Sequence, residues 1–292
     1  MDNNKFESKV SVMDQWAETL RAELARLITD KHPDIIYHYT DANGLIGLID
    51  SGCIWATHVS RLNDASENLH GFNLVSEHVR ANLPIASRPL IEKALLGLQS
   101  VDTYVACYST DSDLLGQWRN YTGTRVGYSL GFETSQMATL DDKMPLLEPI
   151  IYNDSMAKAV LDLLVQRVDE FLMKNPFGEI EIGYLSGMVK ALLNNIACTI
   201  KHHKFEEECE YRHFFRLGDT GLEMEPFFRA GQFGLTPYVK VQFLEKGKLP
   251  LKTITVGPCK NFVLESKALE ILLGKHGYKG VEIFESEIPL RV

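Results

Sequence analysis

Short runs of β-branched and aromatic residues recur along this chain and are separated by helical patterns of very unequal length. The strand-like runs that we interpret in this way cover residues 35–39, 53–57, 101–108, 126–132, 208–217, 238–243, 251–256 and 281–284. A regular alternation of similar strand and helix units would indicate a doubly wound parallel sheet, and the chain does not show that regularity. The sequence therefore predicts a mixed α+β fold.

Helical patterns frame these strands. Apolar residues at helical spacing predict an amphipathic helix at about 6–28, and two long helices over about 154–200. Asp41 and Gly52 are typical of the N-cap and the C-cap of a short helix between them. We find no linker or repeat. We therefore expect a single domain over 1–292, with an N-terminal helix (1–32) and an α+β domain (33–292) that carries a helical insertion at about 154–200.

Composition excludes several classes of protein. The 292 residues have a net charge of −9, and such a chain is repelled by a phosphate backbone, so we expect no broad non-specific nucleic-acid binding. The basic run 201–204 is most simply a solvated turn. The five cysteines form no CxxC pair, which argues against a disulfide framework and a zinc ribbon. Without a signal pattern or a membrane-length apolar run, the chain is expected to be cytoplasmic, with no membrane association.

The most polar part of any predicted strand is Glu208 to Arg212. Alternate side chains of a strand share a face, so Glu208, Glu210 and Arg212 are expected side by side. They would either line a wet cleft, where a paired carboxylate can do chemistry, or form a structural row of ion pairs. Isolated ion pairs add little stability, which favours the cleft.

Two aromatic groups accompany this strand. His38 lies between Tyr37 and Tyr39 and is followed by Thr40 at a strand end, where ligand-binding groups often collect. Burial of His38 in the core is the alternative. Trp118 and Tyr121 are spaced to share one helix face, either as core packing or as a stacking wall for a planar ligand.

Other site signatures are missing from the sequence. It contains no dinucleotide-binding glycine fingerprint, no phosphate-binding P-loop and no serine nucleophile elbow. His202, His203 and His213 lie near acids, but their spacing matches no common zinc motif, so we expect no metal site.

Several motifs nevertheless resemble those of a bacterial family, domain-of-unknown-function family 2971. They cover most of the chain after Ile35 and comprise Tyr37-His38-Tyr39-Thr40, Gly52-Cys53-Ile54-Trp55, Leu62-Asn63-Asp64, Cys107-Tyr108-Ser109, Trp118-Arg119-Asn120-Tyr121, Gly127 to Phe132, Phe205 with Glu208 to Arg212, Thr255 to Pro258 and Ser286 to Pro289. The family usually has proline after the Asn-Asp pair, where this chain has Ala65.

The order of these blocks also resembles the ADP-ribosyltransferase fold of the diphtheria-toxin and poly-ADP-ribose-polymerase type. That resemblance implies a split β-sheet that binds NAD as a substrate, without a metal. It implies that His38 and Thr40 anchor NAD and that Tyr121 or Trp118 stacks on nicotinamide. It implies that Glu210, or alternatively Glu208, binds a hydroxyl of the reacting ribose. It also implies that Arg212 holds this carboxylate in place or contacts a phosphate.

The resemblance therefore implies an ADP-ribosyltransferase, acting on a protein or nucleic-acid acceptor as a bacterial toxin or anti-phage effector. One alternative is an NAD glycohydrolase, with water as the acceptor. The other is a non-catalytic module that binds a nucleotide or a protein. The helical insertion would then recognise either a target or a neutralising partner.

Overall fold

The described chain divides into two compact units. The computed structural model describes residues 3–29, 31–62, 65–100, 102–122, 126–137, 147–216, 225–231, 234–243 and 247–289. The first unit is made of Met1–Lys31, Leu62–Asp102 and Pro149–Phe205, and the second of His32–Arg61, Thr103–Glu148 and Glu206–Val292. The predicted insertion thus shares a unit with the N-terminal helix. Our expectation of a single domain stays a prediction.

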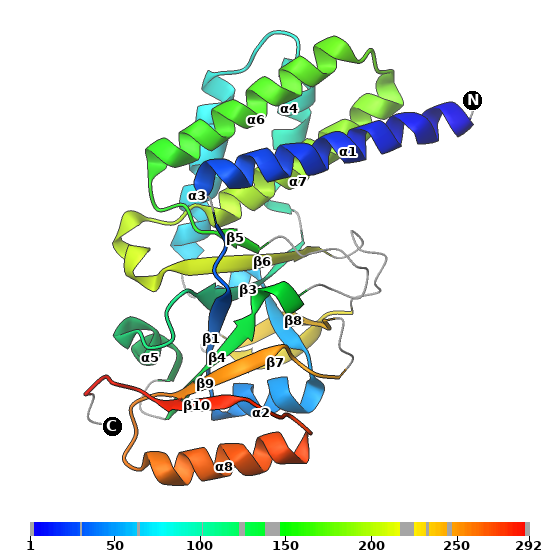
Figure 1. Cartoon of the computed structure of the whole chain (residues 1–292). Helices are drawn as coiled ribbons and strands as arrows, with labels where there is room; N and C mark the ends of the chain where they lie inside the picture. The colour runs from blue at the N-terminus through cyan, green and yellow to red at the C-terminus, as the bar shows by residue number, and fades with distance from the viewer. Residues whose placement is uncertain are drawn as a thin grey trace. The chain divides into compact units, whose positions relative to one another are not determined.

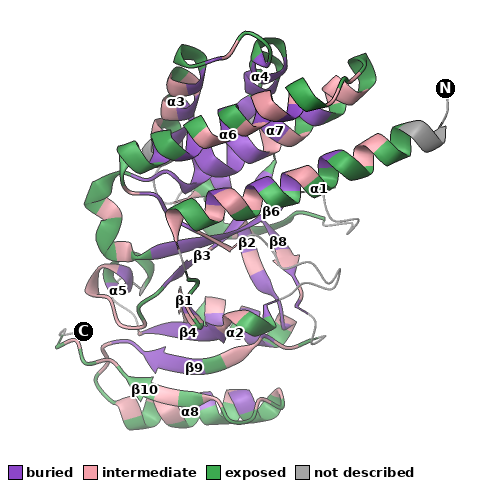
Figure 2. Cartoon of the chain, turned by 45° about the horizontal axis from the view of Figure 1, so that its top comes forward, coloured by how far each residue is buried: buried purple, intermediate pink, exposed green. Residues whose placement is uncertain are grey.

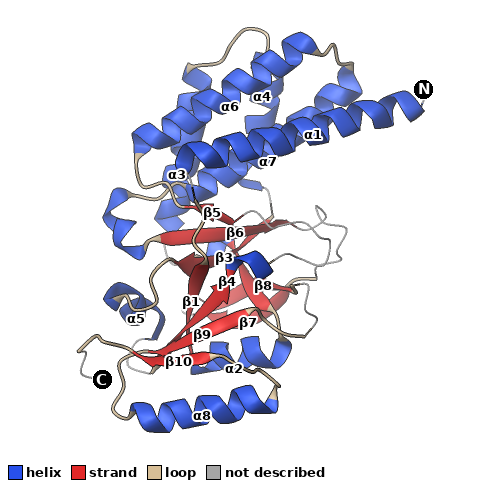
Figure 3. Ribbon diagram, viewed as in Figure 1, coloured by secondary structure: helices blue, strands red, loops and turns tan. Residues whose placement is uncertain are grey.

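The first unit is helical (Figure 3). Its helices are α1 (Asn3–Ile28), α3 (Ala65–Ala81), α4 (Arg88–Leu95), α6 (Asp154–Lys174) and α7 (Glu179–Thr199). Helix α7 packs against α1, α3, α4 and α6, and its inner residues are buried almost without interruption from Leu192 to Thr199. The two long helices predicted over about 154–200 are confirmed as α6 and α7, and Pro176 lies between them, where it cannot continue α6. The helix α1 contributes Met13 and Leu20, both fully buried, to the same core.

The second unit is built on one mixed β-sheet (Figure 1). Its strands are β1 (Ile35–Asp41), β2 (Ile54–His58), β3 (Thr103–Ser109), β4 (Gly127–Glu133), β5 (Leu147–Pro149), β6 (Glu210–Arg216), β7 (Phe227–Gly231), β8 (Gly234–Val241), β9 (Leu251–Val256) and β10 (Glu282–Glu285). The order is β10-β9-β4-β1-β3-β2-β8-β7, with β6 beside β3 and β5 beside β6. Along that order only β9 and β10 run parallel. The predicted mixed α+β class is confirmed.

The core of the second unit lies where the sheet meets helices α2 (Ala42–Ser51) and α8 (Phe262–Lys275). Leu45, Leu48 and Ile49 from α2, and Leu269 and Leu273 from α8, belong to one apolar cluster with the strands. The strands β3 and β4 are buried on both faces (Figure 2), which explains why they read as continuous apolar runs in the sequence. A third helix, α5 (Leu115–Thr122), packs against β1 and β4.

The predicted caps of α2 are confirmed. The Oδ1 atom of Asp41 accepts a hydrogen bond from the backbone N–H of Gly44, at 2.8 Å. Gly52 has φ of 60°, the left-handed conformation that glycine adopts without penalty. Both signals are local, and both place α2 directly after β1.

The strands β5 and β7 were not predicted. The predicted strand at 208–217 begins at Glu210, because Glu208 ends a 3₁₀ helix, η4 (His203–Glu208), and Cys209 has a positive φ of 47°. Asn63 and Asp64, which belong to one quoted motif, lie outside the described residues. Within the described ranges, no helix is long and apolar enough to cross a membrane.

Candidate functional site

The sheet of the second unit is split at one edge of β3. Strand β6 pairs with β3 along its whole length and so occupies one edge, with Thr103 opposite Arg216 and Ser109 opposite Glu210. Strand β2 pairs with β3 at Tyr104 and Val105, and β1 pairs with it at Ser109. A strand has only two edges for ladder hydrogen bonds, so β1 and β2 share the second edge and diverge from it.

His38 of β1 turns its ring toward β3 at this split. Its Nδ1 lies 2.9 Å from the carbonyl oxygen of Cys107, in the middle of β3. A carbonyl oxygen can only accept, so Nδ1 carries the proton and Nε2 of the neutral ring is an acceptor. No hydrogen-bond partner for Nε2 lies in the part of the chain that the structure describes. His38 can therefore accept a hydrogen bond from a ligand hydroxyl.

The His38 ring is neutral at physiological pH. Desolvation by burial lowers its pKa to about 4, the hydrogen bond to Cys107 opposes this shift, and the positive charge of Arg229 adds to it. Arg229 is on β7, which lies at one end of the sheet order and does not pair with β1. Although the two strands do not pair, Arg229 lies within electrostatic range of His38.

Thr40 is placed against helix α2. Its Oγ1 would lie 1.9 Å from a Cβ atom added at Gly44, so its hydroxyl lies against the first turn of that helix. Thr40 and His38 are two residues apart on β1 and share one side of the strand. The predicted NAD-anchoring role of both residues stays a prediction.

Trp118 and Tyr121 of α5 occupy different environments. Trp118 is only 1% exposed, its indole Nε1 donates to Asp113 Oδ1 at 2.7 Å, and its ring packs at 4.7 Å from that of Tyr39. The carboxylate of Asp113 also accepts from Ser286 Oγ and from the N–H of Glu287. Trp118 is thus held as core packing, the alternative raised from the sequence.

Tyr121, in contrast, is accessible to solvent. Its side chain is 40% exposed. Desolvation by the surrounding protein nevertheless raises the pKa of its hydroxyl well above the usual value, and Cys107, Glu210 and Glu208 raise it further. Of the two aromatic residues of α5, Tyr121 is the one that a ligand can reach.

Glu210 and Arg212 form a buried, bidentate ion pair on β6. Arg212 Nε donates to Glu210 Oε1 at 2.7 Å and Nη2 donates to Oε2 at 3.1 Å, and the two side chains are 4% and 6% exposed. Cys107 lies opposite Arg212 and Ser109 opposite Glu210 in the β3–β6 register. The pair therefore holds one carboxylate in a defined orientation on the strand that pairs with β3.

Glu208 is not part of this strand face. It ends η4 and is half-buried, and its backbone carbonyl accepts a hydrogen bond from Ser109 Oγ at 2.9 Å. Its charge nevertheless raises the pKa of Tyr121, as that of Glu210 does. Both carboxylates therefore remain within electrostatic reach of the exposed tyrosine.

Sequence reasoning missed Arg229, because β7 was not predicted. The charge of Arg229 lowers the pKa of His38, and Tyr238, Asp41 and Tyr121 in turn raise the pKa of Arg229 against its own desolvation. It therefore lies within electrostatic range of both His38 and Tyr121. An arginine directly after two aromatic residues, Phe227 and Phe228, was the available signal, but it indicates no strand pairing.

These contacts bring most of the predicted site residues to one place. Cys107 is a common neighbour, bonded to His38 and close to Tyr121. Tyr121 is in turn close to Glu210 and to Arg229. The group offers a hydrogen-bond acceptor, a phenol ring, an oriented carboxylate and a cation, while Trp118 lies apart in the core. Such a set can bind a polar ligand with a planar ring and can stabilise a developing positive charge.

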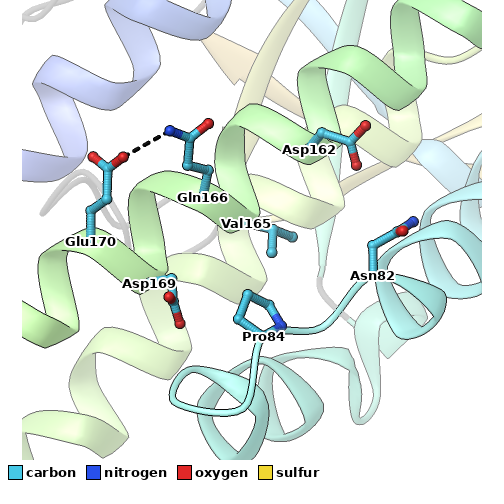
Figure 4. Close-up of a pocket in the computed structure, with 7 residues that line it drawn as sticks. All are labelled: Asn82, Pro84, Asp162, Val165, Gln166, Asp169 and Glu170. Atoms are coloured by element: carbon cyan, nitrogen blue, oxygen red, sulfur yellow. Dashed lines mark hydrogen bonds between the residues drawn. The ribbon is translucent and has the colours of Figure 1, made fainter.

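The helical unit contains a separate pocket of about 260 Å³ (Figure 4). It lies between helix α6 and the turn after α3, and it is lined by Asn82, Pro84, Asp162, Val165, Gln166, Asp169 and Glu170. Its acids are engaged by neighbours, since Asp162 accepts from His78 at 2.7 Å and Asp169 from the N–H of Ser87. Across the described residues, no group of histidines, cysteines and acids could hold a metal ion.

The comparison with known families agrees with the motifs. Residues 117–213 match the model of the family described as "Protein of unknown function (DUF2971)". The predicted resemblance to DUF2971 is confirmed over this segment. The matched DUF2971 segment contains Trp118, Tyr121, Glu208, Glu210 and Arg212, while His38 and Thr40 precede it. The chain matches no curated protein and no solved structure.

Proposed function

We propose that this protein is an ADP-ribosyltransferase that uses NAD as a substrate and modifies a macromolecular acceptor. The proposal is supported by the hydrogen bond of His38 to Cys107 of β3 and by the electrostatic influence of both Cys107 and Glu210 on Tyr121. The sequence resemblance implied a histidine, an aromatic residue and a glutamate around NAD in a split sheet. Residues of those three types from β1, α5 and β6 lie around Cys107 in this chain.

Each residue has a role that its surroundings favour. The neutral His38 accepts a hydrogen bond from a ribose hydroxyl through Nε2. The reachable ring of Tyr121 stacks on nicotinamide. The Glu210 carboxylate, oriented by Arg212, stabilises the positive charge that develops on the ribose as nicotinamide leaves.

The proposed reaction exchanges one bond at the ribose anomeric carbon for another. The glycosidic bond to nicotinamide breaks, and nicotinamide leaves with the bonding electron pair as a neutral molecule. An acceptor nucleophile forms the new bond to the same carbon and releases its proton. No oxidation or reduction takes place, so NAD is consumed as a substrate, and no metal is needed.

Two alternatives remain from the sequence. Water in place of the acceptor would make the protein an NAD glycohydrolase with the same three residues. A non-catalytic nucleotide- or protein-binding module is favoured by one observation, because Glu210 is only 6% exposed and both its oxygens are engaged by Arg212. The acceptor, a neutralising partner and a role as toxin or anti-phage effector stay predictions.

Nicotinamide release from NAD, with and without cell lysate, tests the proposal. We expect release to depend on lysate for a transferase. Glu210→Gln, which keeps the shape and loses the charge, should lower the rate by roughly 10²-fold or more, in line with the loss of one electrostatic stabiliser. The matched change Glu207→Gln, in the same 3₁₀ helix as Glu208 and exposed, should leave the rate unchanged.

Three outcomes would redirect the assignment. Release that is independent of lysate would indicate a glycohydrolase. A larger loss for Glu208→Gln than for Glu210→Gln would make Glu208 the catalytic carboxylate. No release by the unaltered protein, with no rise of its melting temperature in NAD, would contradict both enzymatic functions and favour the binding module.

A further inference from the structure

Arg229 is held by three neutral groups on two strands, β2 and β8. Its Nη2 donates to Thr57 Oγ1 on β2 at 2.9 Å. Its guanidinium carbon lies 5.7 Å from the ring centroid of Trp55 on β2 and 5.5 Å from that of Tyr238 on β8. Two aromatic rings and a hydroxyl orient a planar guanidinium well, but they leave its charge unneutralised.

No carboxylate forms an ion pair with Arg229 among the described residues. Asp41 is the acid that acts on its charge, and Asp41 Oδ1 is already engaged by the N–H of Gly44. Desolvation is the main cause of the lowered pKa of Arg229, so the protein removes water from this cation. A desolvated charge without a counter-charge is unfavourable unless a ligand supplies one.

The position of Arg229 identifies the kind of ligand. Its charge acts on His38, and Tyr121 acts on it in turn, so Arg229 lies within electrostatic range of both residues. An anionic group bound to Arg229 would therefore be part of the same ligand that contacts His38 and Tyr121. Guanidinium groups match the paired oxygens of phosphate better than an ammonium group does.

We propose that Arg229 binds the pyrophosphate of a nucleoside-diphosphate ligand in the split of the sheet. The inference rests on the proposed function for the identity of NAD, but its observations concern only the unpaired cation. Thr57 and the rings of Trp55 and Tyr238 are then positioning groups that hold the guanidinium plane toward the ligand. The free donors of Arg229 supply a bidentate contact to phosphate oxygens.

Binding of ADP-ribose and of inorganic pyrophosphate, measured by calorimetry, tests this role without requiring catalysis. We expect Arg229→Gln to raise the dissociation constant for ADP-ribose at least tenfold. Arg229→Lys keeps the positive charge but lacks the planar guanidinium that makes bidentate contacts. This variant should therefore retain only part of the affinity for ADP-ribose that Arg229→Gln loses. The control Lys240→Gln removes a neighbouring cation on β8, whose Nζ lies 4.6 Å from the Phe227 ring, and should change the constant less than twofold.

The outcomes separate this inference from the proposed function. Arg229-dependent binding of pyrophosphate without any nicotinamide release would support the phosphate site and contradict the transferase. Nicotinamide release combined with unchanged ADP-ribose binding in a folded Arg229→Gln variant would support the transferase and overturn the phosphate site. Equal losses in Lys240→Gln and Arg229→Gln would also overturn it, because they would indicate a diffuse effect of charge. Circular dichroism and the melting temperature without ligand establish that each variant is folded.

Discussion

The buried pair of Glu210 and Arg212 shows how one residue can fit both a structural and a catalytic role. Taking two charges out of water is unfavourable, and a hydrophobic pair of similar volume would often stabilise a strand as well. The bidentate geometry does more for orientation than for stability, because it holds the carboxylate plane relative to β6. This pair would benefit a catalytic site, where a carboxylate must be oriented accurately, more than it would stabilise the sheet.

His38 gives the first prediction, which concerns stability and pH. Its folded pKa of about 4 lies below the usual 6.5, so between these values the unfolded chain binds more protons than the folded one. Stability should therefore fall as the pH decreases from 6.5 to 4. The contribution of His38 to this loss is up to about 3 kcal/mol.

Urea unfolding of the protein and of His38→Gln at several pH values measures this contribution. The variant has no titrating ring, so its free energy of unfolding should decline less between pH 6.5 and 4 than that of the unaltered protein. The exposed His203 provides the control, since His203→Gln should leave the pH dependence as it was. If the free energy of unfolding depends on pH in the same way for His38→Gln and for the unaltered protein, a buried, neutral His38 would be contradicted.

At the scale of elements, local signals explain where helix α2 begins and ends. Asp41 satisfies an N–H of the first turn, and Gly52 takes the left-handed conformation that ends the helix. Gly52 also meets other backbone closely, because an added Cβ would lie 2.2 Å from the carbonyl carbon of Gly247. Two separate effects therefore require glycine at this position.

We predict that Gly52→Ala destabilises the protein by about 2 kcal/mol or more, since it combines a strained φ with a clash against backbone. Gly274→Ala is the matched control in the same unit, because Gly274 is helical and has open space around its Cα. That change should be neutral or stabilise by up to about 1 kcal/mol. Chemical denaturation of both variants measures the difference. A cost below about 0.5 kcal/mol for Gly52→Ala would show that the chain near Gly247 moves to accept the methyl group.

The predicted strand at 208–217 illustrates where local patterns mislead. Its alternation correctly places Glu210 and Arg212 on one face, but it extends that face to Glu208, which lies in η4. Cys209 interrupts the strand through its positive φ, a conformation that residue type alone does not indicate. Only Glu210 and Arg212 of the three predicted neighbours therefore form a pair.

At the scale of the whole molecule, each compact unit is assembled from three separate stretches of chain. The sheet unit takes β1 and β2 from the first, β3, α5 and β4 from the second, and β6 to β10 from the third. The candidate site uses all three stretches, since His38, Tyr121 and Glu210 come one from each. None of these three stretches alone contains His38, Tyr121 and Glu210 together.

The net charge leads to a prediction for the whole molecule. With a net charge of −9 and an isoelectric point near 5.5, the protein should bind random duplex DNA more weakly than about 10⁻⁴ M at physiological salt. Fluorescence anisotropy with a labelled duplex measures this. Micromolar binding that weakens steeply with added salt would contradict the prediction and would indicate a basic surface that the net charge conceals.

The sequence by itself determined the features that depend on neighbours a few residues away. The α+β class, the caps of α2, the break between α6 and α7 and the shared face of Glu210 and Arg212 all follow from periodicity, capping chemistry or the geometry of proline. The tertiary structure alone decided that β1 and β2 share one edge of β3, that Trp118 is buried while Tyr121 is exposed, and that Arg229 lies near His38. Those features depend on the order of the strands in the sheet. The alternation of side chains along a strand shows which residues share a face, but it does not specify which strands pair, and it is this pairing that makes residues far apart in the chain neighbours.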